Sequence, residues 1–394
     1  MSLKDFILPY AVSIRVDDVG WHEGADERWR NRPSRSGLPR RHHPDDVRAL
    51  NAIGKGLGTK IICCLVLGEW DKYNRLRGVP HVTWDEQGWD AAGTMDMAYT
   101  EAYFDALESS DNLEHGVHGL LHGYYENGKL VHERFLYPFL EKDETGRTVA
   151  RPLPPEELET MLDLFYAIYN DWGFKKKITP VWQIGNACFG TPQDEYNRIF
   201  SRILVRKGIG AWQWGGWPKD VEVEDGMIYL NSTLGTVPWD AYDIDPSLLH
   251  NFFEAGPRPG LLPNIRSHLT NYIRFQPEKN FEYVPAWIDY FKRITSPFGA
   301  FMARDNVESA SQAVYVAYSA VDTVDGGIRI DLSGVDKVRT PLVADEFYVA
   351  LRGRDLPRAV TGGRIALHEW RGDHAVYKIT REAGASVVTL GMVD

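Results

Sequence analysis

The sequence predicts an α/β protein: a parallel βα region followed by a small antiparallel β region. Strand-like and helix-like segments alternate through most of the first 300 residues, which is typical of a parallel sheet covered by helices. After Asn306 the pattern changes to short runs of alternating polar and apolar residues, separated by Gly, Asp and Pro. We therefore expect two units, residues 1–305 and residues 306–394.

The first strand, residues 11–17, ends in two adjacent aspartates. Residues 42–57 predict a helix, because Pro44 stands in its first turn and apolar side chains then recur at helical spacing. The apolar run at 59–67 is typical of a strand buried on both faces. A helix at 95–109 and a strand at 113–118 follow.

The central part of the chain continues the alternation. Residues 154–173 predict a strongly amphipathic helix that begins at two prolines and ends at Gly173. Further strands are expected at 177–184, 209–214, 227–231 and 261–267, and further helices at 191–206 and 281–294. These are about seven strands in all, and in βα barrels the functional residues lie at the carboxyl ends of the strands.

The C-terminal unit is expected to be a sandwich-like accessory domain. Its candidate strands are residues 313–318, 327–331, 346–350, 364–368, 375–379 and 386–390. This part contains no group of residues that suggests chemistry.

Charge and cysteine content indicate which binding partners and which cellular compartment to expect. A net charge of −11 disfavours nucleic acid or an anionic membrane as the main partner. Three cysteines, two of them adjacent in an apolar strand, do not describe a disulfide framework and favour a reducing compartment. We expect no membrane span and no signal peptide, hence a cytoplasmic location, although a chain whose leader had been removed would look the same. The oligomeric state stays open.

Tryptophan is unusually frequent, with 13 residues. Many follow strand-like runs or lie in Gly/Pro-rich stretches: Trp21, Trp70, Trp84, Trp89, Trp212, Trp214, Trp217 and Trp239. Indole faces suit the apolar side of a sugar ring, so we expect Trp21, Trp214 and Trp239 to contact a carbohydrate substrate. The alternative is that these rings only cover the ends of a barrel.

Two motifs could together form a metal site. Asp17 ends the first strand and Asp18 follows it, while His118 ends the 113–118 strand and His122 follows in a glycine-rich segment. Each motif is weak alone, because paired aspartates often cap turns and histidine pairs are often solvent-exposed. One carboxylate and two imidazoles suit a borderline-soft divalent cation with an open coordination position. The second carboxylate could then act as a base.

The segments Arg15-Val16-Asp17-Asp18-Val19 and Gly116-Val117-His118-Gly119-Leu120-Leu121-His122 resemble the first two motifs of the NodB-homology polysaccharide deacetylases, carbohydrate esterase family four. The resemblance implies a deformed (β/α)7 barrel. It also implies a divalent metal held by Asp18, His118 and His122, most often zinc, with cobalt, nickel, manganese or iron as other possibilities. Asp17 would be the general base for a water at the metal.

The later motifs of that family have partial counterparts. Gln183 stands where the family has an arginine that pairs with the base, and a neutral amide cannot lower the pKa of Asp17 by charge. We expect Arg266 to supply part of the missing positive charge. The resemblance makes His268 the catalytic acid, and Asp240 and Asp243 are both candidates to orient it.

These observations predict a metal-dependent hydrolase that removes N- or O-linked acetyl groups from a sugar, oligosaccharide or polysaccharide. One alternative keeps the same metal site but hydrolyses another small amide. The other is a non-catalytic carbohydrate-binding protein, which would have no need for a full set of acid, base and metal ligands.

Overall fold

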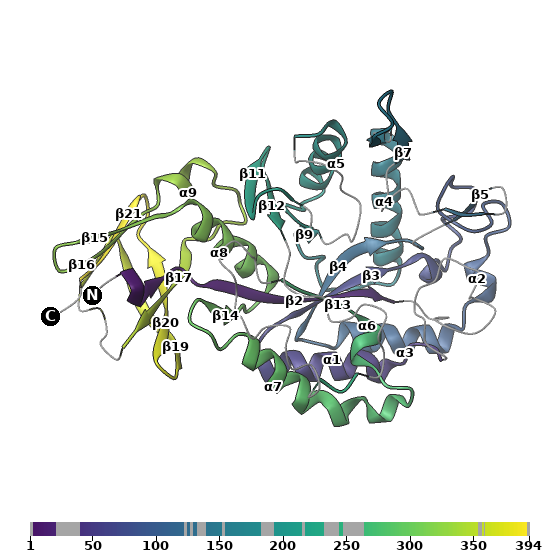
Figure 1. Ribbon diagram of the computed structural model, residues 1–394. Coiled ribbons are helices and arrows are strands. Elements are labelled where there is room, and N and C mark those ends of the chain that lie inside the picture. Colours follow the sequence, from purple (N-terminus) through teal and green to yellow (C-terminus); the bar gives the residue numbers. More distant parts are fainter. Residues whose placement is uncertain are drawn as a thin grey trace.

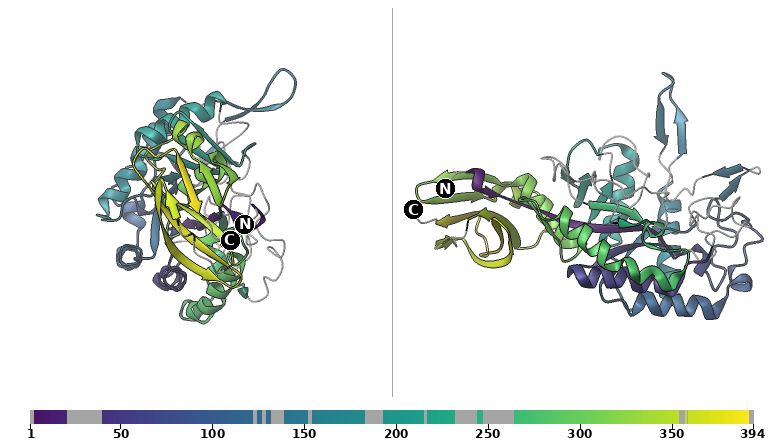
Figure 2. Two further views of the ribbon diagram at one scale, coloured as in Figure 1. Left: turned by 90° about the vertical axis from the view of Figure 1, so that its left-hand side faces the viewer. Right: turned by 60° about the horizontal axis from the view of Figure 1, so that its bottom comes forward.

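The computed structural model of the chain describes residues 3–20, 40–121, 124–126, 129–131, 139–151, 154–182, 193–214, 217–231, 244–246, 264–353, 357 and 359–391. The molecule is elongated, with a βα region at one end and two antiparallel sheets at the other (Figure 1). Both chain ends lie beside the antiparallel sheets (Figures 1 and 2). In the described part of the chain, no helix has the length and apolar character needed to cross a membrane.

Parallel strands form the centre of the βα region. They are β2 (Tyr10–Val19), β3 (Ile61–Val66), β4 (Leu113–Gly119), β9 (Val181–Trp182), β10 (Ala211–Trp214), β12 (Met227–Asn231), β13 (Asn264–His268) and the short β14 (Ala300–Met302). One sheet has the order β13-β2-β3-β4, with β14 beside the start of β2. A second sheet has the order β9-β10-β12, extended by the antiparallel β11 (Val221–Glu224).

A parallel bridge between His115 and Ile178 joins these two sheets, and the Thr179 amide donates to the His115 carbonyl at 2.8 Å. The order β13-β2-β3-β4-β9-β10-β12 therefore contains seven parallel strands. Among the described residues no ladder joins β12 to β13. The expected (β/α)7 barrel therefore stays a prediction.

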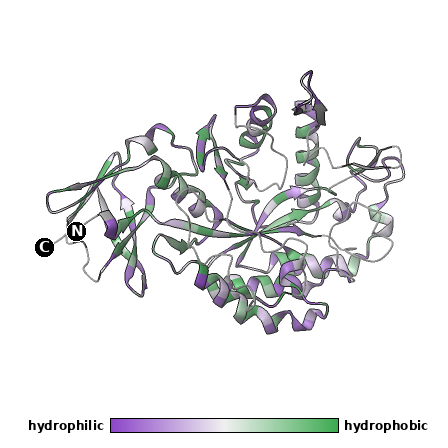
Figure 3. Cartoon of the chain, viewed as in Figure 1, coloured by the Kyte–Doolittle hydropathy of each residue, from purple (hydrophilic) through white to green (hydrophobic). Residues whose placement is uncertain are grey.

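Helices cover the strands. They are α1 (Pro44–Leu57), α2 (Ala91–Thr94), α3 (Met97–Glu108), α4 (Pro155–Asp171), α5 (Glu195–Arg206), α6 (Leu269–Tyr272), α7 (Val284–Ile294), α8 (Asn306–Tyr318) and α9 (Ser333–Lys337). Short 3₁₀ turns lie at Leu3–Asp5, Gly68–Trp70 and Pro277–Tyr283. Helices α1, α3 and α7 run side by side on one face of the β13-β2-β3-β4 sheet (Figure 1). Along α1 and α7 hydrophobic and hydrophilic residues alternate, as helices with one buried face require (Figure 3).

Local signals explain where α1 begins and ends. His43 is its N-cap and forms a capping box with Asp46, and Pro44 occupies the first helical position. Gly58 ends the helix in the left-handed conformation, with φ of 68°. Val47, Leu50 and Ile53 are buried at three-residue spacing.

The C-terminal unit contains two four-stranded antiparallel sheets. Their orders are β1-β17-β20-β19 and β15-β16-β21-β18. The strands are β1 (Phe6–Ile7), β15 (Ala320–Val324), β16 (Gly327–Asp331), β17 (Glu346–Arg352), β18 (Ala359–Thr361), β19 (Gly363–Arg371), β20 (His374–Arg381) and β21 (Val387–Gly391). Alternate side chains of both sheets enter one hydrophobic cluster. Two hairpins, β5 (Tyr124–Glu126) with β6 (Lys129–Val131) and β7 (Phe139–Lys142) with β8 (Thr148–Arg151), project from the βα region (Figure 1).

The expected strand at 313–318 is wrong, because these residues form the second half of helix α8. The alternation of Val and Tyr there imitates a strand, but Asp305 caps the helix by accepting from the Glu308 amide. Buried Ala310, Ala313 and Val314 then fall at helical spacing.

Helix α8 also links the two units across the expected boundary at residue 305. Ser309 donates to the Ala11 carbonyl at 2.7 Å. The side chain of Gln312 donates to the Pro9 carbonyl and accepts from the amide of Tyr348. In addition, β1, from the start of the chain, pairs with β17 of the C-terminal unit. Residues on both sides of the expected boundary thus share one packed structure.

His115 provides a test of this packing. Its ring is fully buried, with Nδ1 2.8 Å from the Tyr169 hydroxyl, which itself donates to the Lys176 carbonyl. Burial and the charge of Lys176 lower the pKa of His115 from 6.5 to about 3. Below about pH 6.5 His115 is protonated in the unfolded chain but stays neutral in the folded protein, so the free energy of unfolding falls as the pH drops.

We expect protonation of His115 in the unfolded chain to lower the free energy of unfolding by up to about 2–3 kcal/mol between pH 6.5 and 4.5. In His115→Phe the free energy of unfolding should fall less steeply as the pH drops, with a slope that corresponds to close to one fewer proton taken up on unfolding. Denaturant unfolding at a series of pH values measures this slope. At pH 8 the ring is neutral in both states, so the comparison there isolates the loss of the Tyr169 contact. An unchanged slope in the variant would contradict the assignment.

Candidate active site

The polar residues singled out in the sequence gather at the carboxyl ends of three parallel strands of one sheet, whose order is β13-β2-β3-β4. Asp17 and Asp18 come from the end of β2, His118 from the end of β4, and His268 is the last residue of β13. Arg266 lies beside Arg15 in the β13-β2 ladder. The four acidic and imidazole side chains are all at least nine-tenths buried.

Irregularities in two strands bring these groups together. Adjacent residues of a regular strand point to opposite faces of the sheet, which would separate Asp17 from Asp18. The β2-β3 ladder shifts register between Val16 and Val19, and Asp18 has a φ of 63°. The β3-β4 ladder shifts between Leu65 and Val66, next to His118. Such bulges re-aim side chains and are common beside active sites.

Asp18 lies between two histidines as a result. One carboxylate oxygen, Oδ1, is 3.2 Å from Nε2 of His118, and the other, Oδ2, is 3.8 Å from Nε2 of His268. His268 is also the N-cap of α6, and its amide donates to the side chain of Asn271 at 2.8 Å. Burial lowers the pKa of His268, although the neighbouring charges of Asp18 and Asp17 partly oppose this shift.

Arg15, to which the sequence motifs assigned no role, is the main charge partner of Asp17. Its guanidinium holds both carboxylate oxygens, with Nε 2.5 Å from Oδ1 and Nη2 2.8 Å from Oδ2. Arg266 adds a contact of 3.3 Å from Nε to Oδ2 of Asp17. Residues 15 and 17 share a face of the strand, so their spacing in the sequence was a usable signal.

These partners keep Asp17 ionised. Burial alone would raise the pKa of Asp17, but the positive charge of Arg15, aided by that of Arg266, holds it well below its ordinary value. The positive charge that the resemblance placed at position 183 is therefore supplied from within β2 and from β13. Gln183 itself lies outside the described residues.

Cys64 also faces this group of side chains. Its sulfur, a carboxylate oxygen of Asp17 and a ring nitrogen of His118 lie within 4.8 Å of one another. Burial, followed by the negative charge of Asp17, raises the pKa of the Cys64 thiol well above its usual range. The free thiol is therefore neutral at physiological pH, which argues against Cys64 as a nucleophile.

Two of these donor atoms are spaced as two ligands of one divalent cation would be. Two ligand atoms bound to one tetrahedral zinc at about 2.0–2.1 Å lie about 3.3–3.4 Å apart. The 3.2 Å separation between Oδ1 of Asp18 and Nε2 of His118 is close to this value. His122, the third ligand that the resemblance implies, lies outside the described residues.

The end of β2 is fixed by a close backbone approach. Gly20 has a φ of 107°, and a Cβ atom there would lie 2.9 Å from the Val66 carbonyl oxygen. The indole N–H of Trp70 donates to the Gly20 carbonyl at 2.6 Å, and Trp172 donates to the Trp70 carbonyl at 2.8 Å. Only glycine fits this position without strain.

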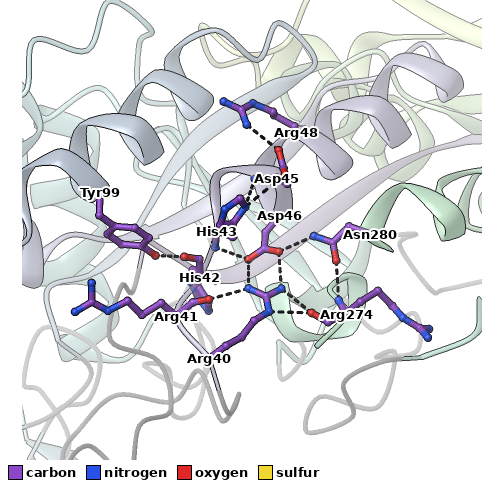
Figure 4. Close-up of polar contacts among 10 residues, drawn as sticks. All are labelled: Arg40, Arg41, His42, His43, Asp45, Asp46, Arg48, Tyr99, Arg274 and Asn280. Atoms are coloured by element: carbon purple, nitrogen blue, oxygen red, sulfur yellow. Dashed lines mark hydrogen bonds and ion pairs between the residues drawn. The ribbon is translucent and has the colours of Figure 1, made fainter. Parts of the chain in front are cut away.

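A second polar network holds the segment that follows α6 (Figure 4). The buried carboxylate of Asp46 accepts from the guanidinium of Arg40 and from the amide group of Asn280. Arg40 also donates to the Arg274 carbonyl, and the Arg274 amide donates to Asn280. This network connects the start of α1 to the chain six residues beyond His268.

The structure does not support a sugar-binding role for most of the described tryptophans. Those at positions 70, 89, 212 and 217 belong to the hydrophobic core. Trp214 is partly buried at the end of β10 and packs edge-on against Trp217, with ring centroids 5.3 Å apart. The remaining expected substrate-contacting or orienting residues, Trp21, Trp239, Asp240 and Asp243, lie outside the described residues.

Comparisons with known proteins identify no family. No family model matches the chain, and no curated protein is significantly similar to it. Among solved structures, an endogalactoceramidase aligns with all of this chain and 97% of its own length, at 11% sequence identity and a TM-score of 0.22. A likeness this low carries no argument about fold or function.

The buried Arg15–Asp17 pair leads to a stability prediction. Arg15→Met leaves the Asp17 carboxylate buried without its main partner, which should lower the free energy of unfolding by about 3–5 kcal/mol. Combining Arg15→Met with Asp17→Asn removes both charges, so the double variant should be more stable than Arg15→Met alone. Denaturant unfolding of the two single variants and the double variant measures this coupling. A loss below about 1 kcal/mol for Arg15→Met would contradict a tightly paired buried charge.

Proposed function

We propose that this chain is a metal-dependent hydrolase that removes acetyl groups from a carbohydrate, built on a deformed (β/α)7 barrel like that of the NodB-type deacetylases. The observation that carries the proposal is the meeting of Asp17, Asp18, His118 and His268 at the carboxyl ends of three parallel strands. The resemblance of the segments 15–19 and 116–122 to the deacetylase motifs adds support.

Asp18 and His118 would hold the cation, together with His122 by resemblance. A bound divalent cation of this kind polarises an acyl carbonyl and makes a water molecule more acidic. Zinc suits the carboxylate and imidazole donors, and cobalt, nickel, manganese and iron are further candidates.

Asp17 would receive the proton of the attacking water. Arg15 grips both of its oxygens, so the carboxylate stays ionised and points in a fixed direction. Its low pKa makes it a weak base and favours prompt release of that proton. Arg15 therefore acts as a positioning residue for Asp17.

His268 would donate a proton to the leaving nitrogen or oxygen. Because burial lowers its pKa, the ring has to gain this proton before it can donate it. The carboxylates of Asp18 and Asp17 beside the ring favour the protonated form. One proton thus leaves the water and another reaches the leaving group, as hydrolysis of an amide or ester requires.

The substrate is the less constrained part of the proposal. Trp214 is the last residue of β10, and its indole is partly exposed. This indole supports a sugar as the substrate. Because the tryptophans at 70, 89, 212 and 217 are in the core, a small non-carbohydrate amide is the second candidate for the same site. Binding of glycan without hydrolysis is the non-catalytic alternative.

Acetate release from a panel of N- and O-acetylated sugars, with and without a chelator, tests the function. Asp18→Asn and His118→Ala should abolish release, because each removes a metal ligand. Asp17→Asn and His268→Gln should lower the rate about 10²–10⁴-fold. His115→Phe is the matched control, since His115 lies on the same strand but against Tyr169 and outside this group of side chains.

The possible outcomes separate the candidates. Hydrolysis of small amides without release from sugars would favour the second candidate. Glycan binding without any hydrolysis under metal supplementation would reject the enzyme altogether.

A further inference from the structure

The two adjacent cysteines of β3 face opposite sides of the sheet. Cys64 pairs with Gly116 in the β3-β4 ladder, two residues before His118, whereas Cys63 pairs with Val16 and His115. Cys63 belongs to the hydrophobic cluster under the helices. Cys64 instead lies beside Asp17 and His118, in the group of side chains described above.

The position of the Cys64 sulfur suits metal ligation. In a tetrahedral zinc site with Zn–S of about 2.3 Å and Zn–N of about 2.0–2.1 Å, the sulfur and nitrogen lie about 3.5–3.6 Å apart. The sulfur of Cys64 is within 4.8 Å of a ring nitrogen of His118, so closing around a cation needs a shift of at most about 1.3 Å. Strand β3 lies between β2 and β4, so the side chain of Cys64 lies near residues of both strands.

Asp17 is the third member of this cluster, but its oxygens are already held by Arg15 and Arg266. Asp18, in contact with His118, is the better placed carboxylate ligand. His118 is the residue common to both contacts: its ring lies 3.2 Å from Asp18 and within 4.8 Å of the Cys64 sulfur. A cation at His118 would therefore have one carboxylate, one imidazole and one sulfur as donors. Sulfur donors favour zinc, cobalt or cadmium over magnesium or manganese.

We propose that Cys64 is a sulfur ligand to the cation held by Asp18 and His118, and that this ligand makes the site selective for thiophilic divalent cations. This inference rests on the proposed function only in that the site binds a cation. On binding, the S–H bond breaks, the proton goes to solvent and a sulfur–metal bond forms, without any change in oxidation state.

X-ray absorption at the zinc edge of the zinc-loaded wild-type protein tests the ligand without any mutation. A sulfur scatterer at about 2.3 Å is expected beside the nitrogen and oxygen scatterers at about 2.0–2.2 Å. A shell of nitrogen and oxygen alone would overturn the sulfur ligand and leave the proposed hydrolase intact. Failure of the protein to bind zinc at all would overturn both.

Cobalt titration of the metal-free protein gives the second readout, with Cys63→Ser as the matched control for Cys64→Ser. The wild type and Cys63→Ser should show a near-ultraviolet sulfur-to-cobalt charge-transfer band. Cys64→Ser should lose this band and bind cobalt at least about 10-fold more weakly. Mutating a residue that only hydrogen-bonds to a metal ligand already lowers metal affinity about 10–100-fold, and loss of a ligand should lower it at least as much. Equal affinity and identical spectra in all three proteins would refute the role of Cys64.

Discussion

The pairing of Arg15 with Asp17 is the constraint on which the rest of the site depends. Removing an arginine and a carboxylate from water costs several kcal/mol per ion, so each must find its partner inside the fold. Both residues are on β2, two positions apart, and their pairing needs only that strand. The apolar residues between and before them, Val16 and Ile14, face the helices and join the hydrophobic core. One strand thus supplies both the core and the charged site, and a register slip by one residue would exchange the two faces.

The charges around the site nearly cancel. Arg15 and Arg266 face Asp17 and Asp18, and the histidines add no charge while they are neutral. A divalent cation, as proposed above, would add two positive charges to this buried, nearly neutral group and would favour anionic ligands there.

Much of the architecture could be predicted from residue patterns. The continuous apolar run at 59–67 indicated a doubly buried strand, and β3 occupies Ile61–Val66. Alternation failed at 313–318, where small buried residues of a capped helix imitate a strand. The role of Arg15 as the partner of Asp17 could have been predicted, because residues two positions apart in a strand lie on the same face. The approach of Cys64 to His118 could not be predicted, because it depends on a register between strands fifty residues apart and on a bulge that no local pattern announces. The roles expected for His122, Gln183, Asp240 and Asp243 concern residues outside the described structure.

The long strand β2 has a consequence for how the protein is made. On one edge its neighbour is β13, which follows about 250 positions later in the chain. Strand β14 pairs with the first residues of β2 about 290 positions later, and β1 just before β2 pairs with β17 still further on. During vectorial synthesis the central strand must therefore wait, with one edge unpaired, until most of the polypeptide has left the ribosome. The cluster of Asp17, Asp18, His118 and His268 consequently forms late in biogenesis, and truncated nascent chains would present an open sheet edge to chaperones.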